Sequence, residues 1–141
     1  MAVTATTQVL EDGPRNLVVH LTADATANND VETANTKINV STLSTQPDTG
    51  ASCTHVSIER IQFMTQNGLN VKLYWGANTN QLALTLPGSF SDSYDFLKNG
   101  APIVNNAGAG KTGNLLLTSE NPANTAPGRY SITLWCRKSY N

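Results

Sequence analysis

The sequence predicts an all-β protein, an antiparallel sandwich or barrel of about eight or nine strands, with a jelly-roll-like fold preferred. Three observations predict this class. Short apolar runs alternate with polar residues at a period of two, turn-forming Gly, Pro and Asn pairs separate these runs, and no window of a dozen residues has a helical period. The turn signals recur about every 8 to 12 residues, which is the spacing of a sandwich or barrel.

The expected strands follow from this alternation, taken in chain order. Residues 1–12 form either an N-terminal arm that adds a strand to a neighbour or the first strand of the protein's own sheet. After them, apolar residues repeat at every second position in six stretches. These stretches are 17–21, 38–42, 71–75, 82–86, 115–117 and 130–136.

Two further stretches need a local irregularity or a choice. In 54–65 the inward parity changes at Arg60, which predicts a β-bulge there. Asn67-Gly68 suits a type I′ turn joining this strand to the next, and 76–80 closes a second hairpin. Residues 91–100 suit either a short helix or a strand, and the strand is favoured.

Loops are expected at 23–35, 43–51, 105–113 and 121–126, where Ala, Asn, Thr and Gly are frequent and no apolar period is found.

Length and composition predict one domain over residues 1–141 with a weakly charged surface. Hydrophobic residues make up 39% of the 141 residues and charged residues 13%, about half the average share. The net charge is −1 with no run of either sign, so neither a nucleic acid nor a membrane is an expected partner. The first residues also lack the pattern of a secretory signal.

The candidates for chemistry are few, and no enzyme, metal or cofactor is predicted. Cys53 and Cys136 are expected to be buried free thiols, with a disulfide or a metal site as alternatives. Cys53 and His55 lie two residues apart and could join His20 in a metal or catalytic cluster, but a chance pairing is favoured, with His20 on a polar strand face. Asp92 and Asp95 could be considered as a catalytic pair of carboxylates, but a solvated loop or strand face is the favoured interpretation.

Residues 105–112 (NNAGAGKT) look superficially like a phosphate-binding loop. The motif needs a Gly five positions before Gly110, but Asn105 stands there. The residues after Gly113 also predict a strand rather than the helix whose N-terminus would hold phosphates. The segment is therefore expected to be a flexible Gly-rich loop.

The aromatic residues give the candidate interface. Trp75 shares the parity of the apolar residues of its strand, whereas Trp135 has the opposite parity to its strand's apolar residues. Tyr74 likewise faces away from Trp75. An outward Trp135 or Tyr74 predicts contact with another subunit, cover by a loop or a sugar-stacking platform.

The ordered segments of the chain resemble a family of small tailed-bacteriophage structural proteins encoded among virion and head-module genes. The resemblance covers nearly the whole chain, although no segment carries a chemical mechanism. The segments are 12–16 (DGPRN), 40–43 (VSTL), 58–61 (IERI), 71–75 (VKLYW), 105–113 (NNAGAGKTG), 115–118 (LLLT) and 130–134 (YSITL).

This resemblance implies a virion protein, and the expected role is capsid cement or decoration. The implied partners are the major capsid protein and copies of the chain itself, with a trimer as one arrangement. The implied location is the phage capsid surface, with the host cytoplasm during assembly. A host-surface or glycan-binding module and a head-tail connector component are the alternatives.

Overall fold

The computed structural model describes residues 3–140, and nearly all of their regular structure is β. One 3-10 turn interrupts the strands, and no helix in these residues has the length and hydropathy needed to cross a membrane. The all-β prediction is therefore confirmed. The elements are β1 (Val3–Asp12), β2 (Asn16–Ala25), β3 (Asn35–Ile38), η1 (Val40–Thr42), β4 (His55–Gln66), β5 (Asn70–Trp75), β6 (Gln81–Leu86), β7 (Ser91–Asp95), β8 (Leu115–Glu120) and β9 (Arg129–Ser139).

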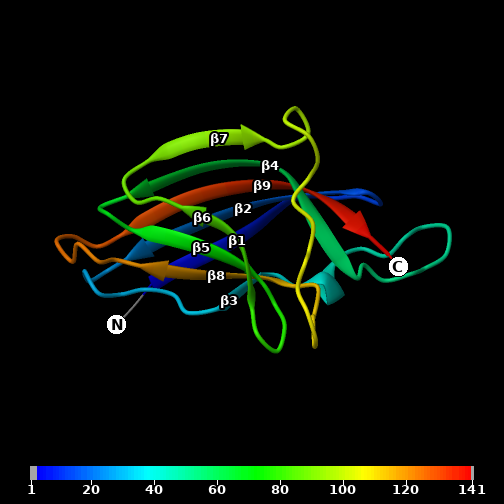
Figure 1. Ribbon diagram of the computed structural model, residues 1–141, viewed down its shortest axis with the longest axis horizontal. Coiled ribbons are helices and arrows are strands. Elements are labelled where there is room, and N and C mark those ends of the chain that lie inside the picture. Colours follow the sequence, from blue (N-terminus) through cyan, green and yellow to red (C-terminus); the bar gives the residue numbers. More distant parts are fainter. Residues whose placement is uncertain (1–2, 141) are drawn as a thin grey trace.

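The strands form two antiparallel sheets that face each other as a sandwich (Figure 1). The five-stranded sheet has the order β1-β2-β9-β4-β7, and the four-stranded sheet has the order β3-β8-β5-β6. The pairs β2·β9, β3·β8, β4·β7 and β5·β6 are nested one inside the next. A long hairpin rolled around one core gives this nesting, which is the jelly-roll arrangement.

One hydrophobic cluster fills the space between the sheets. Strands β2, β4, β5, β8 and β9 contribute alternate residues to it, because successive side chains of a strand point to opposite faces, whereas β1 and β7 at the edges of the five-stranded sheet contribute no fully buried residue. Burying one large apolar side chain contributes about 1.5–3 kcal/mol. The largest of the fully buried side chains are Trp75, Leu17, Leu21, Ile58, Ile61, Leu73, Leu115, Leu117, Ile132 and Leu134.

Two local predictions on β4 and the turn after it are confirmed. The register between β4 and β9 shifts between Ile58 and Arg60, where the sequence predicts a bulge. Asn67 and Gly68 have φ values of 62° and 77°, so both turn positions lie in the left-handed region that the type I′ turn needs. The bulge lets β4 change its inward parity and bury residues on both sides of it.

Two predictions about segment boundaries are wrong. The strand expected over 38–42 ends at Ile38, because the side chain of Asn39 accepts a hydrogen bond from the backbone of Ser41 and caps a 3-10 turn. The loop expected from Ala23 begins later, since Ala23 and Ala25 continue the inward face of β2 and are buried. Their small side chains give only a weak hydrophobic signal in the sequence.

The structure also decides between the two alternatives for the N-terminal segment. β1 pairs with β2 along its whole length, from Val3 opposite Ala25 to Asp12 opposite Leu17. The segment is therefore the first strand of its own sheet and not a free arm. Met1 and Ala2, which also belong to the expected arm, lie outside the described residues.

Candidate functional site

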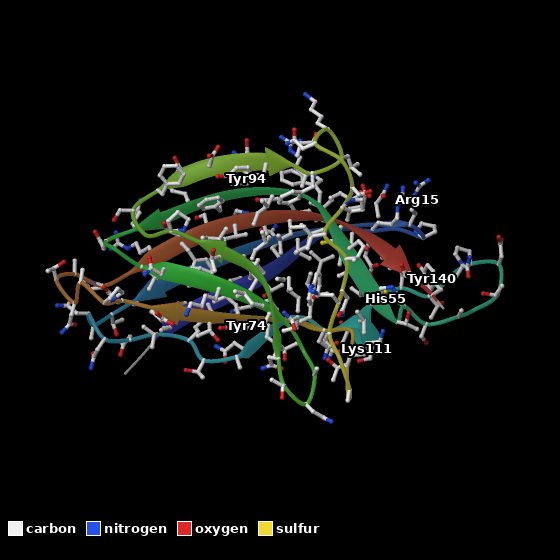
Figure 2. All side chains as sticks on the ribbon, viewed as in Figure 1. Arg15, His55, Tyr74, Tyr94, Lys111 and Tyr140 are labelled. Carbon is white, nitrogen blue, oxygen red and sulfur yellow. The ribbon has the colours of Figure 1, made fainter. Side chains whose placement is uncertain are left out.

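Trp135 and Tyr74, the two predicted interface residues, lie on opposite outer faces of the sandwich. Trp135 is half-buried on the five-stranded sheet, whereas Trp75 is fully buried in the core. Tyr74, labelled in Figure 2, is half-buried on the four-stranded sheet. Its partners on the neighbouring strands are Leu116 and Leu82. Both side chains point outward as predicted, but the structure does not bring them together into one site.

The ring of Trp135 is not a free stacking surface. The Arg60 guanidinium carbon lies 4.5 Å from the ring centroid, which is the distance of a cation–π contact. Arg60 stands directly opposite Trp135 in the register of β4 and β9. A sugar could stack on the face of the ring that Arg60 covers only after displacing this guanidinium.

The outer face of the five-stranded sheet carries a row of polar side chains that contains no Asp, Glu, Lys or Arg. Five residues stand in register across it, one from each strand, and His20 Nδ1 lies 2.8 Å from Thr133 Oγ1. His20 thus sits on a polar strand face. The residues of the row are Gln8, His20, Thr133, Gln62 and Ser93.

Two shallow hollows adjoin this row and share Met64 and Ser131. The first measures about 440 Å³ and the second about 400 Å³. Hydroxyl and amide groups provide most of their polar lining, and the exposed Arg129–Asp24 ion pair, with 2.8 Å between the two side chains, borders the second. We call this area, the polar row with its two hollows, the polar sheet face. It offers many hydrogen-bonding groups and little net charge.

A group of aromatic side chains follows the edge strand β7. Phe63 and Tyr94 stack with their centroids 6.3 Å apart, and Tyr94 stacks on Phe96 at the same distance. Tyr94, labelled in Figure 2, is 44% exposed. Phe90, which contacts Phe63, is 46% exposed. Period-two alternation predicts the strand here but does not reveal that these rings stay accessible at a sheet edge.

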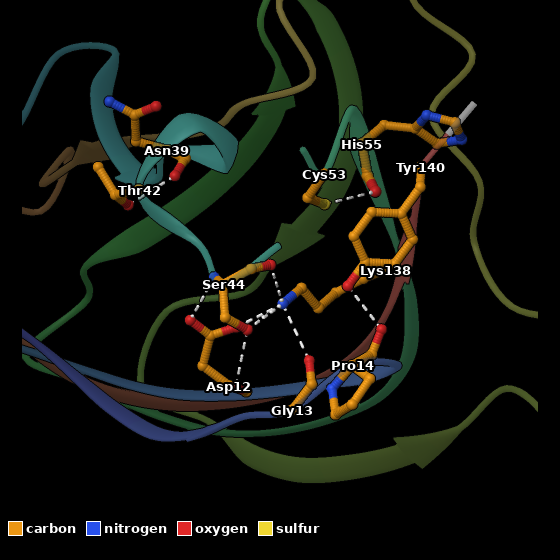
Figure 3. Close-up of polar contacts among 10 residues, drawn as sticks. All are labelled: Asp12, Gly13, Pro14, Asn39, Thr42, Ser44, Cys53, His55, Lys138 and Tyr140. Atoms are coloured by element: carbon orange, nitrogen blue, oxygen red, sulfur yellow. Dashed lines mark hydrogen bonds and ion pairs between the residues drawn. The ribbon is translucent and has the colours of Figure 1, made fainter. Parts of the chain in front are cut away.

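A buried lysine near the C-terminus fastens three segments together (Figure 3). Lys138 Nζ lies 2.5 Å from Asp12 Oδ1 and also donates to the carbonyl oxygens of Gly13 and Ser44, each at 2.9 Å. Its side chain is inaccessible to solvent. Lys138 shares the inward parity of β9, so parity analysis of that strand could have found it.

The charges at this network stabilise each other. Partial burial alone would raise the pKa of Asp12, but the hydrogen bonds from Lys138 and Ser44 and the lysine's charge lower it below its ordinary value. Desolvation alone would lower the pKa of Lys138, but the Asp12 carboxylate and Tyr140 raise it. Both groups are therefore charged at neutral pH, and the ammonium acts as a structural cation.

A second buried polar network surrounds the carboxylate of Glu32. Its oxygens lie 2.5 Å from Lys37 Nζ and 2.5 Å from the Tyr130 hydroxyl, and Asn35 donates at 2.8 Å. Burial, together with the bond to Glu32, raises the pKa of Tyr130. Because Tyr130 belongs to β9 and Lys37 to β3, this network ties the two sheets together.

The residues considered for metal binding or catalysis do not form a cluster. Cys53 and Cys136 are buried free thiols, as predicted, and burial raises the pKa of Cys136 to about 12. Cys53 donates to the His55 carbonyl, while His20 lies on the polar sheet face. Among residues 3–140, no group of three or more His, Cys, Asp or Glu side chains could hold a metal ion.

Asp92 and Asp95 are engaged separately. The carboxylate of Asp92 accepts a hydrogen bond from Ser93, whereas that of Asp95 accepts the backbone N–H of Leu97 in the following turn. Asp95 stands opposite Arg60 and Asp92 opposite the inward-pointing Phe63, so the two carboxylates point to opposite faces of the sheet. They do not form a pair suited to acid–base catalysis.

The Gly-rich loop packs against the turn between β5 and β6 and leads into strand β8. Asn78 donates to the Ala109 carbonyl, and Thr112 donates to the Gly76 carbonyl. His55 and Lys111, both labelled in Figure 2, line a hollow beside this loop. The hollow measures about 340 Å³. The strand that follows confirms the expectation that no phosphate-binding helix begins here.

Most of strand β1 is exposed on both faces, including Val9 at 53% and Leu10 at 54%, which the sequence pattern does not predict. Its inward-facing residues pair with buried residues of β2 but are not themselves covered by the four-stranded sheet. Alternation alone could not show this, because it identifies the two faces of a strand without saying which is covered.

Comparisons with known proteins give no family. No protein-family model matches the chain, and no curated protein matches it. Among solved structures the chain is similar to Peruvianin-I, a cysteine peptidase from Thevetia peruviana latex, with 12% identity and a TM-score of 0.33. The match covers 97% of this chain and 63% of the peptidase chain, so the chain spans less than two thirds of that protein. A likeness at this TM-score carries no argument about fold or activity.

Proposed function

We propose that the protein is a structural subunit of a bacteriophage virion, a decoration protein that binds the outside of the capsid and stabilises the head. The resemblance of its ordered segments to small tailed-phage structural proteins supports this role. The sandwich fold is compatible with it, although folds of this kind serve many functions. The major capsid protein and further copies of the chain are the proposed partners.

The polar sheet face is the observation that carries this proposal. Its polar row consists mostly of short or moderately long side chains, so ordering them against another protein costs limited conformational entropy. Hydroxyl and amide groups also lose less on desolvation than unpaired charges do. A lattice that repeats such a contact many times gains strong total binding from individually modest interfaces.

The test uses particles of the phage that encodes the chain, assembled without this protein. Purified wild-type protein is added, and binding is measured by co-sedimentation and by the temperature at which the particles release their genome. Wild-type protein is expected to sediment with the particles and to raise that temperature. No binding would overturn the decoration role.

A pair of matched variants locates the contact. Ser131→Arg places a long charged side chain in the exposed area shared by the two hollows and is expected to abolish sedimentation with particles. Thr36→Arg makes the same change at an exposed position of β3, in the other sheet, and is expected to bind as wild type does. Equal binding by both variants would exclude the polar sheet face as the contact.

The hollows also favour a second candidate, a glycan-binding virion module. Their hydroxyl, amide and carboxylate lining offers the donors and acceptors that sugar hydroxyls need. Trp135 lies outside these two hollows and Arg60 covers one face of its ring, so hydrogen bonding in the hollows rather than stacking on Trp135 is the proposed sugar contact. Binding of the isolated protein to an oligosaccharide array, lost in Ser131→Arg, would favour this candidate, and absence of binding would exclude it for the sugars present.

A further inference from the structure

Strand β1 overhangs the sandwich and leaves one edge of the five-stranded sheet without a partner. It is the outermost strand of that sheet, next to β2. Ala5, Thr7 and Val9 point to the inner side, yet all three are exposed, while their partners Ala23, Leu21 and Val19 on β2 are buried. The overhang therefore offers a free backbone edge with neither face obstructed.

The backbone groups at this free edge can be assigned from hydrogen bonds elsewhere in the sheet. The backbone N–H of Ala25 on β2 donates to the Gly128 carbonyl on the side of β9. The backbone N–H and C=O groups of the odd-numbered residues of β2 therefore point to β9, and those of the even-numbered residues point to β1. Thr22 is paired with Thr6, so the backbone of Thr6 is directed to β2. The backbone groups of Ala5 and Thr7, one residue to either side, consequently point outward.

The edge lacks the features that usually prevent strand addition. Residues 3–10 contain no charged residue, no proline and no glycine, and they are rich in Thr and Val. The one irregularity, a register shift between Val9 and Glu11, leaves residues 3–9 regular. The acidic residues Glu11 and Asp12 both lie at the C-terminal end of the strand.

We propose that β1 is a self-association edge, which pairs in antiparallel orientation with β1 of a second copy to join two five-stranded sheets across a two-fold axis at Thr6. A second copy presents the same uncharged edge, rich in Thr and Val, so the two edges match each other, and charge then selects the antiparallel orientation. Parallel pairing would place the acidic ends of the two strands side by side, whereas antiparallel pairing keeps them at opposite ends of an uncharged contact. The proposal concerns the isolated protein and does not depend on the virion role.

The register follows from the outward-pointing groups and from the length of the regular segment. Residues that point to the free edge must pair with each other, and only a register centred on Thr6 pairs the whole regular segment 3–9 of one copy with that of the other, so Ala5 pairs with Thr7 and Val3 pairs with Val9. Thr6 then faces its own equivalent in a non-hydrogen-bonded pair, where Cα atoms are about 4.5 Å apart. This distance lies within the range that a disulfide bridges.

The register is tested by engineered cross-linking in the otherwise native chain, since Cys53 and Cys136 are both buried. Thr6→Cys is expected to form an interchain disulfide under mild oxidation, seen by intact mass spectrometry at twice the 15.0 kDa chain mass. Gln8→Cys is the control, exposed on the same face of β1. In the proposed register, position 8 of one copy and position 8 of the other lie four residues apart along the strands. This separation is about 13 Å, too far for a disulfide.

The expected cross-linking rate is about tenfold or more higher for Thr6→Cys than for Gln8→Cys, because pairing raises the effective concentration of the two thiols. Equal rates, or a faster Gln8→Cys reaction, would overturn the proposed pairing. Neither outcome bears on capsid binding, so failure here is distinguishable from failure of the proposed function.

Light scattering after size-exclusion chromatography provides the second test. The wild-type mass is expected to rise toward twice 15.0 kDa with concentration. Thr7→Pro removes an N–H from the free edge but none from the β1–β2 ladder, and is expected to remain monomeric, whereas Thr7→Val keeps the donor and dimerises. A monomeric wild type at several hundred micromolar, or a dimeric Thr7→Pro with wild-type circular dichroism, would contradict the proposal.

Discussion

Lys138→Met removes the buried ammonium while keeping much of the side chain's length and apolar volume. Two carbonyl oxygens, of Gly13 and Ser44, lose their charged donor. Breaking a buried ion pair by removing one partner costs about 3–5 kcal/mol. The lower end applies because the Asp12 side chain is 24% exposed and still accepts hydrogen bonds from the backbone and hydroxyl of Ser44. We therefore expect a loss of about 3 kcal/mol.

The loss is measured by urea unfolding followed by tryptophan fluorescence, and it corresponds to a fall in Tm of about 10 °C for a chain of this length. The control is Lys72→Met, which breaks the exposed Lys72–Glu120 pair, whose Nζ and Oε1 lie 2.8 Å apart. This variant is expected to unfold close to wild type, since surface pairs contribute little. Equal losses in the two variants would refute the argument that Lys138 fastens the segments.

The same comparison has a pH dependence with a definite sign. The pKa of Asp12 is lowered in the folded state, so its contribution to stability is present above the unfolded pKa, near 3.9, and is lost as the pH falls through the folded value. The stability difference between wild type and Lys138→Met is therefore expected to be smaller at pH 2 than at pH 7. An unchanged difference would show that the Asp12 charge is not part of the network.

Two further variants test other parts of the fold. Tyr130→Phe removes the hydroxyl that donates to Glu32 and is expected to cost about 2 kcal/mol. The pKa of Tyr130 is raised in the folded state, so above pH 10 this hydroxyl ionises in the unfolded chain but not in the folded one, and wild type loses stability there. Tyr130→Phe lacks this hydroxyl and should lose less stability at alkaline pH, as measured by melting curves over a range of pH. Gly113 has a φ of 84°, and the Cβ of Gly113→Ala would overlap the Thr54 carbonyl oxygen. Gly50 has a similar φ of 72°, but the Cβ of Gly50→Ala would have no other atom within 4 Å, so this variant is the control. Gly113→Ala should lower Tm clearly more than Gly50→Ala, and similar values would refute the steric explanation.

Much of the fold could be predicted because strand periodicity and turn chemistry are local properties. The parity change at Arg60 predicts the bulge, and Asn67-Gly68 predicts the turn after β4. The end of β3 is not predictable from the alternation, because a single side-chain cap at Asn39 overrides the pattern that continues through Val40. The extension of β2 is not predictable either, because alanine contributes little to an apolar pattern.

The sites were harder to predict because they depend on contacts between distant segments. Parity correctly placed Trp135 and Tyr74 on outer faces, but only the topology shows that these faces are opposite and that Arg60 covers one of the rings. The overhang of β1 depends on one sheet having an extra strand. The contacts of Lys138 with Asp12 join residues near the two ends of the chain, and no local pattern records them.

The central proposal is that this chain decorates a phage capsid, and the most direct test is its abundance in purified particles of the phage proposed to encode it. Quantitative mass spectrometry would compare its copy number with that of the major capsid protein. The decoration role predicts a simple, lattice-related ratio of this chain to the major capsid protein. A few copies per particle would contradict decoration and favour a connector or adsorption role, and complete absence would contradict any role in the virion.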